Sequence, residues 1–196
     1  GYSVSSAGDV NGDGYDDLVI GARFADPNES FSGSSYVVFG GAATTGAIVN
    51  LSSLDGTNGF RLDGEQAQQS GKSVSSAGDV NGDGYDDLII GAYYADPNGT
   101  NSGSSYVVFG SGSAFASTVD LSTLDGTTGF RLDGELAYDQ SGHSVSSAGD
   151  VNGDGYDDLI IGANGADFNG SYSGSSYVVF GTGSAFAATV DLSTLD

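Results

Sequence analysis

One acidic nonapeptide occurs three times in this chain and limits what the chain can fold into. The sequence Asp-Val-Asn-Gly-Asp-Gly-Tyr-Asp-Asp begins at Asp9, Asp79 and Asp150, and the same flanking segments surround each copy. A fixed period of about 70 residues is typical of repeat proteins, in which each repeat is one supersecondary unit. The sequence therefore predicts three tandem units, with boundaries at 1–70, 71–140 and 141–196.

Each unit contains short segments typical of β-strands, separated by glycine-rich and Asn/Asp-rich turns. Their apolar triplets, such as Leu18-Val19-Ile20, suit strands that are covered on both faces. Four-stranded units in tandem indicate an all-β fold built from propeller blades. The expected strands are 3–7, 17–22, 35–40 and 59–64 in the first unit, 73–77, 87–92, 105–110 and 129–134 in the second, and 144–148, 158–163 and 176–181 in the third.

The third unit lacks an equivalent of the fourth strand, the Gly-Phe-Arg-Leu-Asp-Gly segment at 59–64 and 129–134. Three blades are also fewer than the roughly four to eight of a closed propeller. We therefore expect an incomplete last blade and a larger propeller or array, in which further repeats or copies of the chain supply the missing strand. The absence of Met also favours a processed or excised piece of something longer.

The charge of the chain excludes several classes of function. The formal net charge is −22, with only four Lys and Arg residues against 26 Asp and Glu, so nucleic acids and anionic membrane surfaces are poor partners. There is no Cys for a disulfide or a thiolate site, and no apolar run long enough to enter a membrane. The three nonapeptides hold 12 of the acidic residues, an arrangement that favours cation binding.

The nonapeptide is predicted to be a calcium loop. Calcium binds six to eight oxygen ligands, and carboxylates are prominent among them. In the first copy we assign the side chains of Asp9, Asn11, Asp13 and Asp17 and the carbonyl of Tyr15 as ligands. The intervening glycines allow a tight bend. The remaining acid, at the eighth position, is expected to point away from the metal and to cap or hydrogen-bond the loop.

The same residues could instead form an EF-hand or a metal-free turn. An EF-hand needs a bidentate Glu at position 12, where this chain has Ile20, Ile90 and Ile161 inside apolar segments. The simpler alternative is a metal-free Asx/Gly turn, since Asn-Gly and Asp-Gly are common hairpin signals. Four clustered carboxylates in each of three copies would repel one another without a cation, which favours calcium. Magnesium suits such a flexible all-oxygen loop less well.

The sequence Gly-Asp-Val-Asn-Gly-Asp-Gly-Tyr-Asp-Asp-Leu-Ile-Ile-Gly-Ala, followed by Tyr-Val-Val-Phe-Gly, resembles the FG-GAP repeat of integrin alpha-chain β-propellers and their bacterial counterparts. The resemblance covers nearly the whole chain. It implies one blade per unit, with calcium between the first two strands of each blade. The implied ligands are Asp9, Asn11, Asp13, Tyr15 and Asp17 in the first loop, Asp79, Asn81, Asp83, Tyr85 and Asp87 in the second, and Asp150, Asn152, Asp154, Tyr156 and Asp158 in the third.

The chain departs from that family in three respects. The Pro that usually follows Gly-Ala is replaced by Arg23, Tyr93 and Asn164. The units are also long, and no partner domain for integrin-style ligand recognition is present, so that mode of recognition is not carried over. The near-identity of the units resembles bacterial secreted or surface arrays.

Three matching sequons, at Asn28, Asn98 and Asn169, are candidate glycosylation sites. Plain turn chemistry explains the same residues more simply. A Ser-His-Asp or Cys-His site cannot be assembled from one histidine and no cysteine, and no acidic pair breaks the repeat symmetry as a glycosidase would. The chain is therefore not expected to be an enzyme.

Phe39, Phe60 and Tyr36 recur with the repeat and are expected in the core, and Arg61 and Arg131 are expected to pair with a nearby Asp. Phe24, Tyr93 and Tyr94 are less regular, and a binding surface, if the chain has one, is expected at these residues.

The function predicted from these features is that of an extracellular, calcium-stabilised structural or adhesive module. Near-identical units are predicted to allow head-to-tail assembly into a ring or filament, with neighbouring repeats or copies of the chain as partners. The alternative is a carbohydrate- or protein-binding, lectin-like propeller domain of a larger surface protein. Glycans and surface proteins are then the expected partners.

Overall fold

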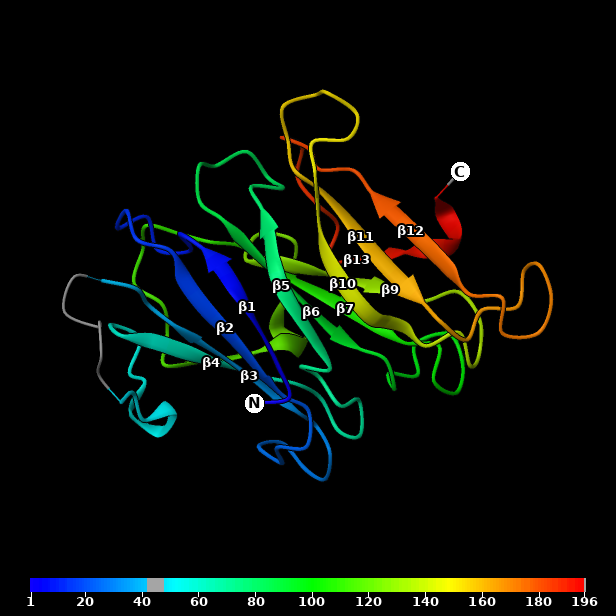
Figure 1. Cartoon of the computed structure of the whole chain (residues 1–196), viewed down its shortest axis with the longest axis horizontal. Coiled ribbons are helices and arrows are strands. Elements are labelled where there is room, and N and C mark those ends of the chain that lie inside the picture. Colours follow the sequence, from blue (N-terminus) through cyan, green and yellow to red (C-terminus); the bar gives the residue numbers. More distant parts are fainter. Residues whose placement is uncertain (42–47, 196) are drawn as a thin grey trace.

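The computed structural model of the chain describes residues 1–41 and 48–195, and it is all-β apart from three short 3-10 helices. Three sheets stand side by side in chain order (Figure 1). The first strands of the three repeats, β1 (Ser3–Gly8), β5 (Ser73–Gly78) and β10 (Ser141–Gly149), lie next to one another. This arrangement confirms the predicted propeller-like blades.

In each sheet the strands of one repeat form an antiparallel meander. In the first repeat β2 (Asp17–Ala22), β3 (Ser34–Val38) and β4 (Gly59–Asp63) follow β1. The predicted second strands agree with the observed bounds at both ends, and the other predicted strands differ from the observed bounds by one to three residues at one or both ends. The remaining strands are β6 (Asp87–Ala92), β7 (Ser104–Val108) and β9 (Gly129–Asp133) in the second repeat, and β11 (Asp158–Ala163) and β12 (Ser175–Val179) in the third.

Two strands that the sequence did not predict link neighbouring repeats. β8 (Thr118–Asp120) belongs to the second repeat but pairs in parallel with β4 of the first. β13 (Thr189–Asp191) belongs to the third repeat and pairs in the same way with β9 of the second. The first two sheets therefore have five strands each, whereas the third has only β10, β11 and β12 among the described residues. Each of the first two blades is completed by the repeat that follows it.

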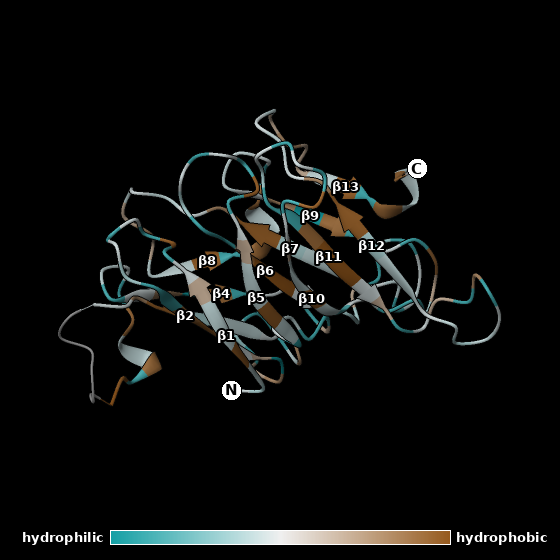
Figure 2. Ribbon diagram, turned by 45° about the horizontal axis from the view of Figure 1, so that its top comes forward, coloured by the Kyte–Doolittle hydropathy of each residue, from teal (hydrophilic) through white to brown (hydrophobic). Residues whose placement is uncertain are grey.

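The hydrophobic core consists of two layers, one between each pair of neighbouring sheets. Figure 2 shows hydrophobic residues, in brown, along strands of these sheets. The first layer combines Val19 and Val37 of the first repeat with Leu88 and Ile90 of the second. The second layer combines their counterparts in the second and third repeats. Every residue of β6 is buried because sheets cover both of its faces, as its continuous apolar sequence predicted. Phe39, Phe60 and their counterparts Phe109 and Phe130 are buried in these layers, as expected.

A 3-10 helix follows β8 and β13, and a third lies at the same position in the first repeat. Each begins after an Asn or Asp whose side chain accepts a hydrogen bond from the N–H two residues later, which caps the helix. The helices are η1 (Leu51–Ser53), η2 (Leu121–Thr123) and η3 (Leu192–Thr194). No helix of the described residues has the length and hydropathy needed to cross a membrane.

Candidate metal-binding loops and their surroundings

The three acidic loops occupy the same end of their blades. Each loop begins as the first strand of the blade ends and finishes where the second strand starts, for example between Gly8 and Asp17. The register between β1 and β2 shifts after Ser6, which is a bulge that ends regular pairing and starts the loop. The resemblance placed the metal between these two strands, and the structure brings the assigned residues of each loop together there.

The oxygens of the loop carboxylates receive hydrogen bonds from the loop backbone. In the first loop Asp9 accepts from the N–H of Asp13 at 3.0 Å and from the N–H of Gly14 at 2.9 Å. Asn11 also accepts from the N–H of Asp13, at 2.9 Å, and Asp13 accepts from the N–H of Tyr15 at 3.0 Å. The other two loops repeat these contacts. The bent loop is thus already formed, with its carboxylate and amide oxygens turned inward.

The last acid of each loop, represented by Asp17, fastens the loop to the sheet. The buried Asp17 side chain accepts from the N–H of Val10 at 3.1 Å and from the N–H of Gly40 at 2.8 Å. Asp87 and Asp158 are also buried and make equivalent pairs of bonds. Burial raises the pKa of Asp17 to about 6 and that of Asp87 to about 8, and nearby loop carboxylates add to the effect. Each of these carboxylates lacks a Lys or Arg partner in the described chain.

The donor set fits an oxygen-seeking cation, although the side chains need to move to bind one. In residues 1–41 and 48–195, no group of three His, Cys, Asp or Glu side chains is placed to hold a metal ion in the present conformation. Each loop contributes carboxylates, one Asn amide and backbone carbonyls, which are the ligands that calcium prefers. The assignment of individual ligands stays a prediction.

Neighbouring loops are clamped together by the acid at the eighth position. The Asp86 side chain accepts a hydrogen bond from the N–H of Asp9 at 2.8 Å, and Asp157 accepts from the N–H of Asp79 at 2.9 Å. A backbone bond accompanies each contact, at 3.3 Å and 3.2 Å. This acid was expected to serve its own loop, whereas Asp86 and Asp157 hold the loop of the preceding repeat. Asp16 occupies the same position in the first repeat and is exposed.

The predicted glycosylation sites lie on exposed turns, and two of them have structural roles. The side-chain amide of Asn28 donates to the carbonyl of Gly64 at 3.2 Å and to Asp120 at 3.3 Å. Asn98 donates in the same way to Gly134 at 2.9 Å and to Asp191 at 3.0 Å. These bonds support the turn interpretation, because they use the nitrogen to which a glycan would attach. Asn169 is exposed.

The arginines of the fourth strands form the expected ion pairs. Arg61 lies 2.7 Å from Asp63, and Arg131 lies 2.8 Å from Asp133. Each pair stands beside a buried serine hydroxyl that donates to the same Asp. These two arginines therefore have structural partners.

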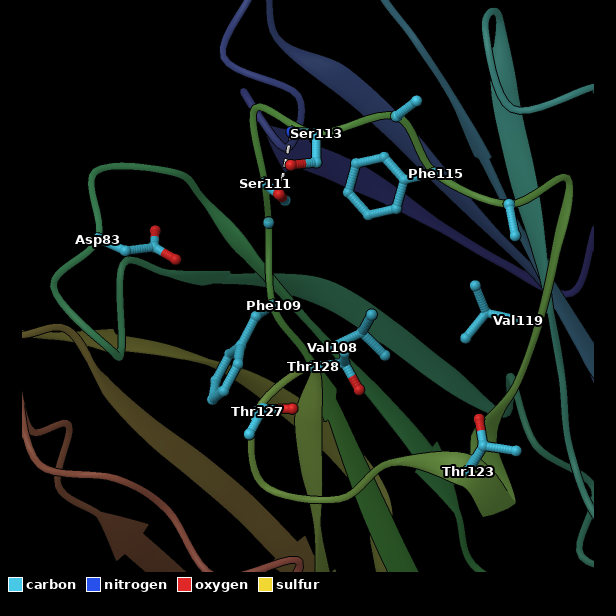
Figure 3. Close-up of a pocket in the computed structure, with 13 residues that line it drawn as sticks. Asp83, Val108, Phe109, Ser111, Ser113, Phe115, Val119, Thr123, Thr127 and Thr128 are labelled. Atoms are coloured by element: carbon cyan, nitrogen blue, oxygen red, sulfur yellow. Dashed lines mark hydrogen bonds between the residues drawn. The ribbon is translucent and has the colours of Figure 1, made fainter.

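A hollow of about 420 Å³ lies beside the second acidic loop. Figure 3 shows Asp83 on one side of it, with Phe109, Phe115, Val119 and Thr127 around the rest. A hollow of about 670 Å³ has the equivalent position in the first repeat and is lined by the counterparts Asp13, Phe39, Val49 and Thr57. These hollows were not predicted from the sequence.

The sequence is similar to a known repeat family and to integrin alpha chains. The sequence model of the family described as FG-GAP repeat matches residues 1–38, 70–108 and 141–179, more than half of the chain. Integrin alpha-PS5 of Drosophila melanogaster is 31% identical over 167 residues, which cover 85% of this chain and 15% of that protein. Integrin alpha-7 of Homo sapiens is 30% identical over 165 residues, covering 83% of this chain and 12% of that protein. Integrin alpha pat-2 of Caenorhabditis elegans is 32% identical over 167 residues, covering 83% and 13%. The chain thus spans less than one sixth of the length of these relatives.

Proposed function

The chain belongs to the FG-GAP repeat family, and from this premise we propose that it is an extracellular, adhesion-type repeat module whose blades are stabilised by calcium. The observation that carries the proposal is the buried carboxylate of each loop, Asp17, Asp87 or Asp158, which faces other loop oxygens without a Lys or Arg partner in the described chain. Burial without a cationic partner disfavours the charged form of a carboxyl group, and a cation held by the loop oxygens would stabilise that form.

Calcium would act by linking metal binding to folding. The metal-free loop brings four carboxylates into one turn, so its folded form is opposed by their repulsion. A cation that binds only the folded state stabilises it by about 2.7 kcal/mol per site at a concentration 100-fold above Kd. Extracellular calcium modules function with sites as weak as roughly 10⁻⁴–10⁻³ M. The clamps from Asp86 and Asp157 would transmit this stabilisation from loop to loop.

Assembly with further repeats is supported by two uncovered apolar sheet faces. Val4 on the outer face of the first sheet is 73% exposed, whereas its counterpart Val74 is 6% exposed under the first blade. Phe180 on the outer face of the third sheet is 56% exposed, whereas Phe109 is 8% exposed. The two exposed faces are equivalent to the two sheet faces that pack together in each core layer between neighbouring blades. We infer that a further FG-GAP repeat covers each face, and that head-to-tail addition yields a ring or filament.

The experiment that tests the proposal combines thermal melting with electron microscopy. Melting in calcium and in chelator is expected to show a higher Tm in calcium, with magnesium giving a smaller shift. An unchanged Tm would refute calcium stabilisation. Electron microscopy of native material tests assembly separately, because isolated three-blade particles would refute the head-to-tail arrangement without affecting the calcium result.

The second candidate function is binding of carbohydrate or protein. The specific observation in its favour is the hollow that recurs beside the loops of Asp13 and Asp83, since a lectin-like propeller is expected to repeat its pocket from blade to blade. A soluble sugar that raises Tm would support this function. A binding role of either kind, rather than catalysis, remains our proposal, as does a bacterial secreted or cell-surface origin.

A further inference from the structure

A cluster of cations and aromatic rings lies at the opposite end of the blades from the acidic loops. Tyr2 precedes β1 and Arg23 follows β2, so antiparallel pairing places both at the end away from the loop. Phe24, Lys72 and Tyr93 join them from the first two repeats. We call these five residues the cation–aromatic cluster.

Arg23 is held at the centre of this cluster by rings rather than by an acid. Its guanidinium carbon lies 4.1 Å from the ring centroid of Tyr2 and 4.3 Å from that of Phe24, which are cation–π distances. Its Nη1 donates to the hydroxyl of Tyr93 at 2.8 Å. Its Nε is buried and has no hydrogen-bond partner, and the same holds for the Nε of Arg61.

Lys72 adds a second positive charge to the same place. Its Nζ donates to the Tyr2 hydroxyl at 3.2 Å and lies 5.0 Å and 5.4 Å from the rings of Tyr2 and Tyr93. The ion pairs of the described chain involve only Arg61 and Arg131. Half of the four basic residues therefore meet without a carboxylate partner, in a chain with 26 acidic residues. Two cations that contact the same rings of Tyr2 and Tyr93 repel each other, so this arrangement favours an anion beside them.

At this end of the blades, the three repeats have different residues at two positions whose neighbours are identical. Tyr2, Lys72 and His143 occupy one equivalent position, and Arg23, Tyr93 and Asn164 occupy another, whereas the adjoining Ser-Val and Gly-Ala pairs are the same in all three repeats. The strands form with any of these residues. The fold of the repeat therefore does not require the combination of two cations with exposed rings.

A hollow of about 260 Å³ adjoins the cluster and is lined by Tyr2, Arg23 and Phe24 together with small residues. Lys72 is not part of this lining but donates to the hydroxyl of Tyr2, which is. Tyr2 and Phe24 are 51% and 54% exposed. Pockets for drug-sized ligands measure roughly 300–1,000 Å³, so this hollow suits a single sugar-sized ring. A peptide with several acids is disfavoured, because the net charge of −22 repels it.

We propose that the cation–aromatic cluster binds one acidic sugar unit, with Arg23 and Lys72 holding its carboxylate and the ring of Tyr2 or Phe24 covering one face of the sugar. The guanidinium and ammonium donors match a carboxylate. The inference does not depend on calcium binding, and its site lies apart from the recurring hollows beside the acidic loops.

The test is an NMR shift titration of the whole chain in calcium buffer at low ionic strength, with glucuronate as the probe and glucose as its neutral counterpart. Glucuronate is expected to bind with a roughly millimolar Kd, at least about tenfold more tightly than glucose. Arg23→Gln and Lys72→Gln should each weaken glucuronate binding about tenfold. Arg61→Gln removes a cation that is already paired with Asp63 and should leave the affinity unchanged.

Arg23→Lys keeps the charge and serves as a second variant if Arg23→Gln fails to fold, and it should retain part of the glucuronate affinity. Equal binding of glucuronate and glucose, or no binding of either, would overturn the proposal. Tighter binding of a short aspartyl peptide than of glucuronate would also overturn it, because the ligand would then be a protein.

Discussion

The ring of Phe115 lies flat against the ring of Phe60, with centroids 4.4 Å apart and planes 4° apart. Phe115 belongs to the second repeat and Phe60 to the fourth strand of the first, so the contact joins two blades. Phe39 completes the group, with its centroid 5.9 Å from each of the other two. The next pair of repeats has the same arrangement, because Phe186 stacks on Phe130 at 4.3 Å. Each of these ring stacks thus helps to hold β8 or β13 against the preceding blade.

Replacing Phe115 with Ala is expected to loosen the first blade from the second. The substitution removes a half-buried aromatic ring and its stacking, which costs about 2–4 kcal/mol. For a chain of this size the Tm should fall by roughly 5–10 °C in thermal melts. Hydrogen exchange should show the largest loss of protection at β4 and β8.

Phe180→Ala is the matched control for that substitution. Phe180 is exposed on the outer face of the third sheet, so its removal from the isolated chain should lower stability by less than about 1 kcal/mol. Equal losses for Phe115→Ala and Phe180→Ala would contradict the idea that the Phe115 ring joins the blades.

The strands that carry the loops were predictable, because their apolar triplets and flanking turns are local signals. β6 is buried on both faces, as its Leu88-Ile89-Ile90 sequence indicated. β8 and β13 were not predictable. They are only three residues long, and they pair with a strand of the preceding repeat, which no local pattern specifies. The one sequence feature that could have indicated this pairing is Phe115 and its counterpart Phe186. They precede β8 and β13, whereas the first repeat has no Phe at the equivalent position.

The acidic loops were predicted as sequence segments, but their connection to each other was not. The bond from the Asp9 N–H to Asp86 spans 77 positions and depends on how the blades stack. The cation–aromatic cluster was missed for the same reason, since Arg23 and Lys72 meet only after two repeats have packed together. Irregularity after the Gly-Ala pairs did identify the region, including Phe24 and Tyr93, as a candidate binding surface.

Asp86→Ala is expected to weaken calcium binding at the first loop rather than at its own. A hydrogen bond to a charged group contributes about 1.5–3 kcal/mol, so loss of the bond to the Asp9 N–H should raise Kd of the first loop roughly tenfold or more. Calcium titrations followed by NMR at Gly12 and Gly82 would separate the two loops.

Asp16→Ala is the control for Asp86→Ala. Asp16 is exposed and clamps no loop within the described chain, so its removal should leave the affinities of the second and third loops unchanged. A change confined to the second loop in Asp86→Ala would show that Asp86 serves its own loop, contrary to the observed contact.

Stability is expected to fall in mild acid partly because of His143. Burial and the nearby charges of Lys72 and Arg23 lower the pKa of His143 below its usual value of 6.5, and its ring contacts Tyr93 at 5.6 Å. Well above pH 6.5 the His143 side chain is neutral in both the folded and the unfolded state. Below that pH the unfolded state takes up a proton more readily, so the folded state loses stability as pH falls.

The measurement for His143 is the difference in Tm between pH 7.5 and pH 5.5, compared with that of His143→Gln. Both proteins share all carboxylates, so the difference between them isolates the histidine. The native chain should lose more stability than the variant. An equal loss in the two proteins would contradict the prediction.

The glycines at the fourth loop position offer a comparison within one chain. Gly82 and Gly153 have similar backbone angles, with φ of +75° and +79°, so Ala is strained at both by roughly 1 kcal/mol. A Cβ at Gly82 would also lie 2.3 Å from the ring of Tyr156 in the next loop, whereas a Cβ at Gly153 has no neighbour within 4 Å in the described chain. Gly82→Ala should therefore cost about 1–3 kcal/mol more than Gly153→Ala in chemical unfolding. Equal costs would mean that adjacent loops do not pack against each other in solution. That result would also contradict the contact between Asp157 and Asp79.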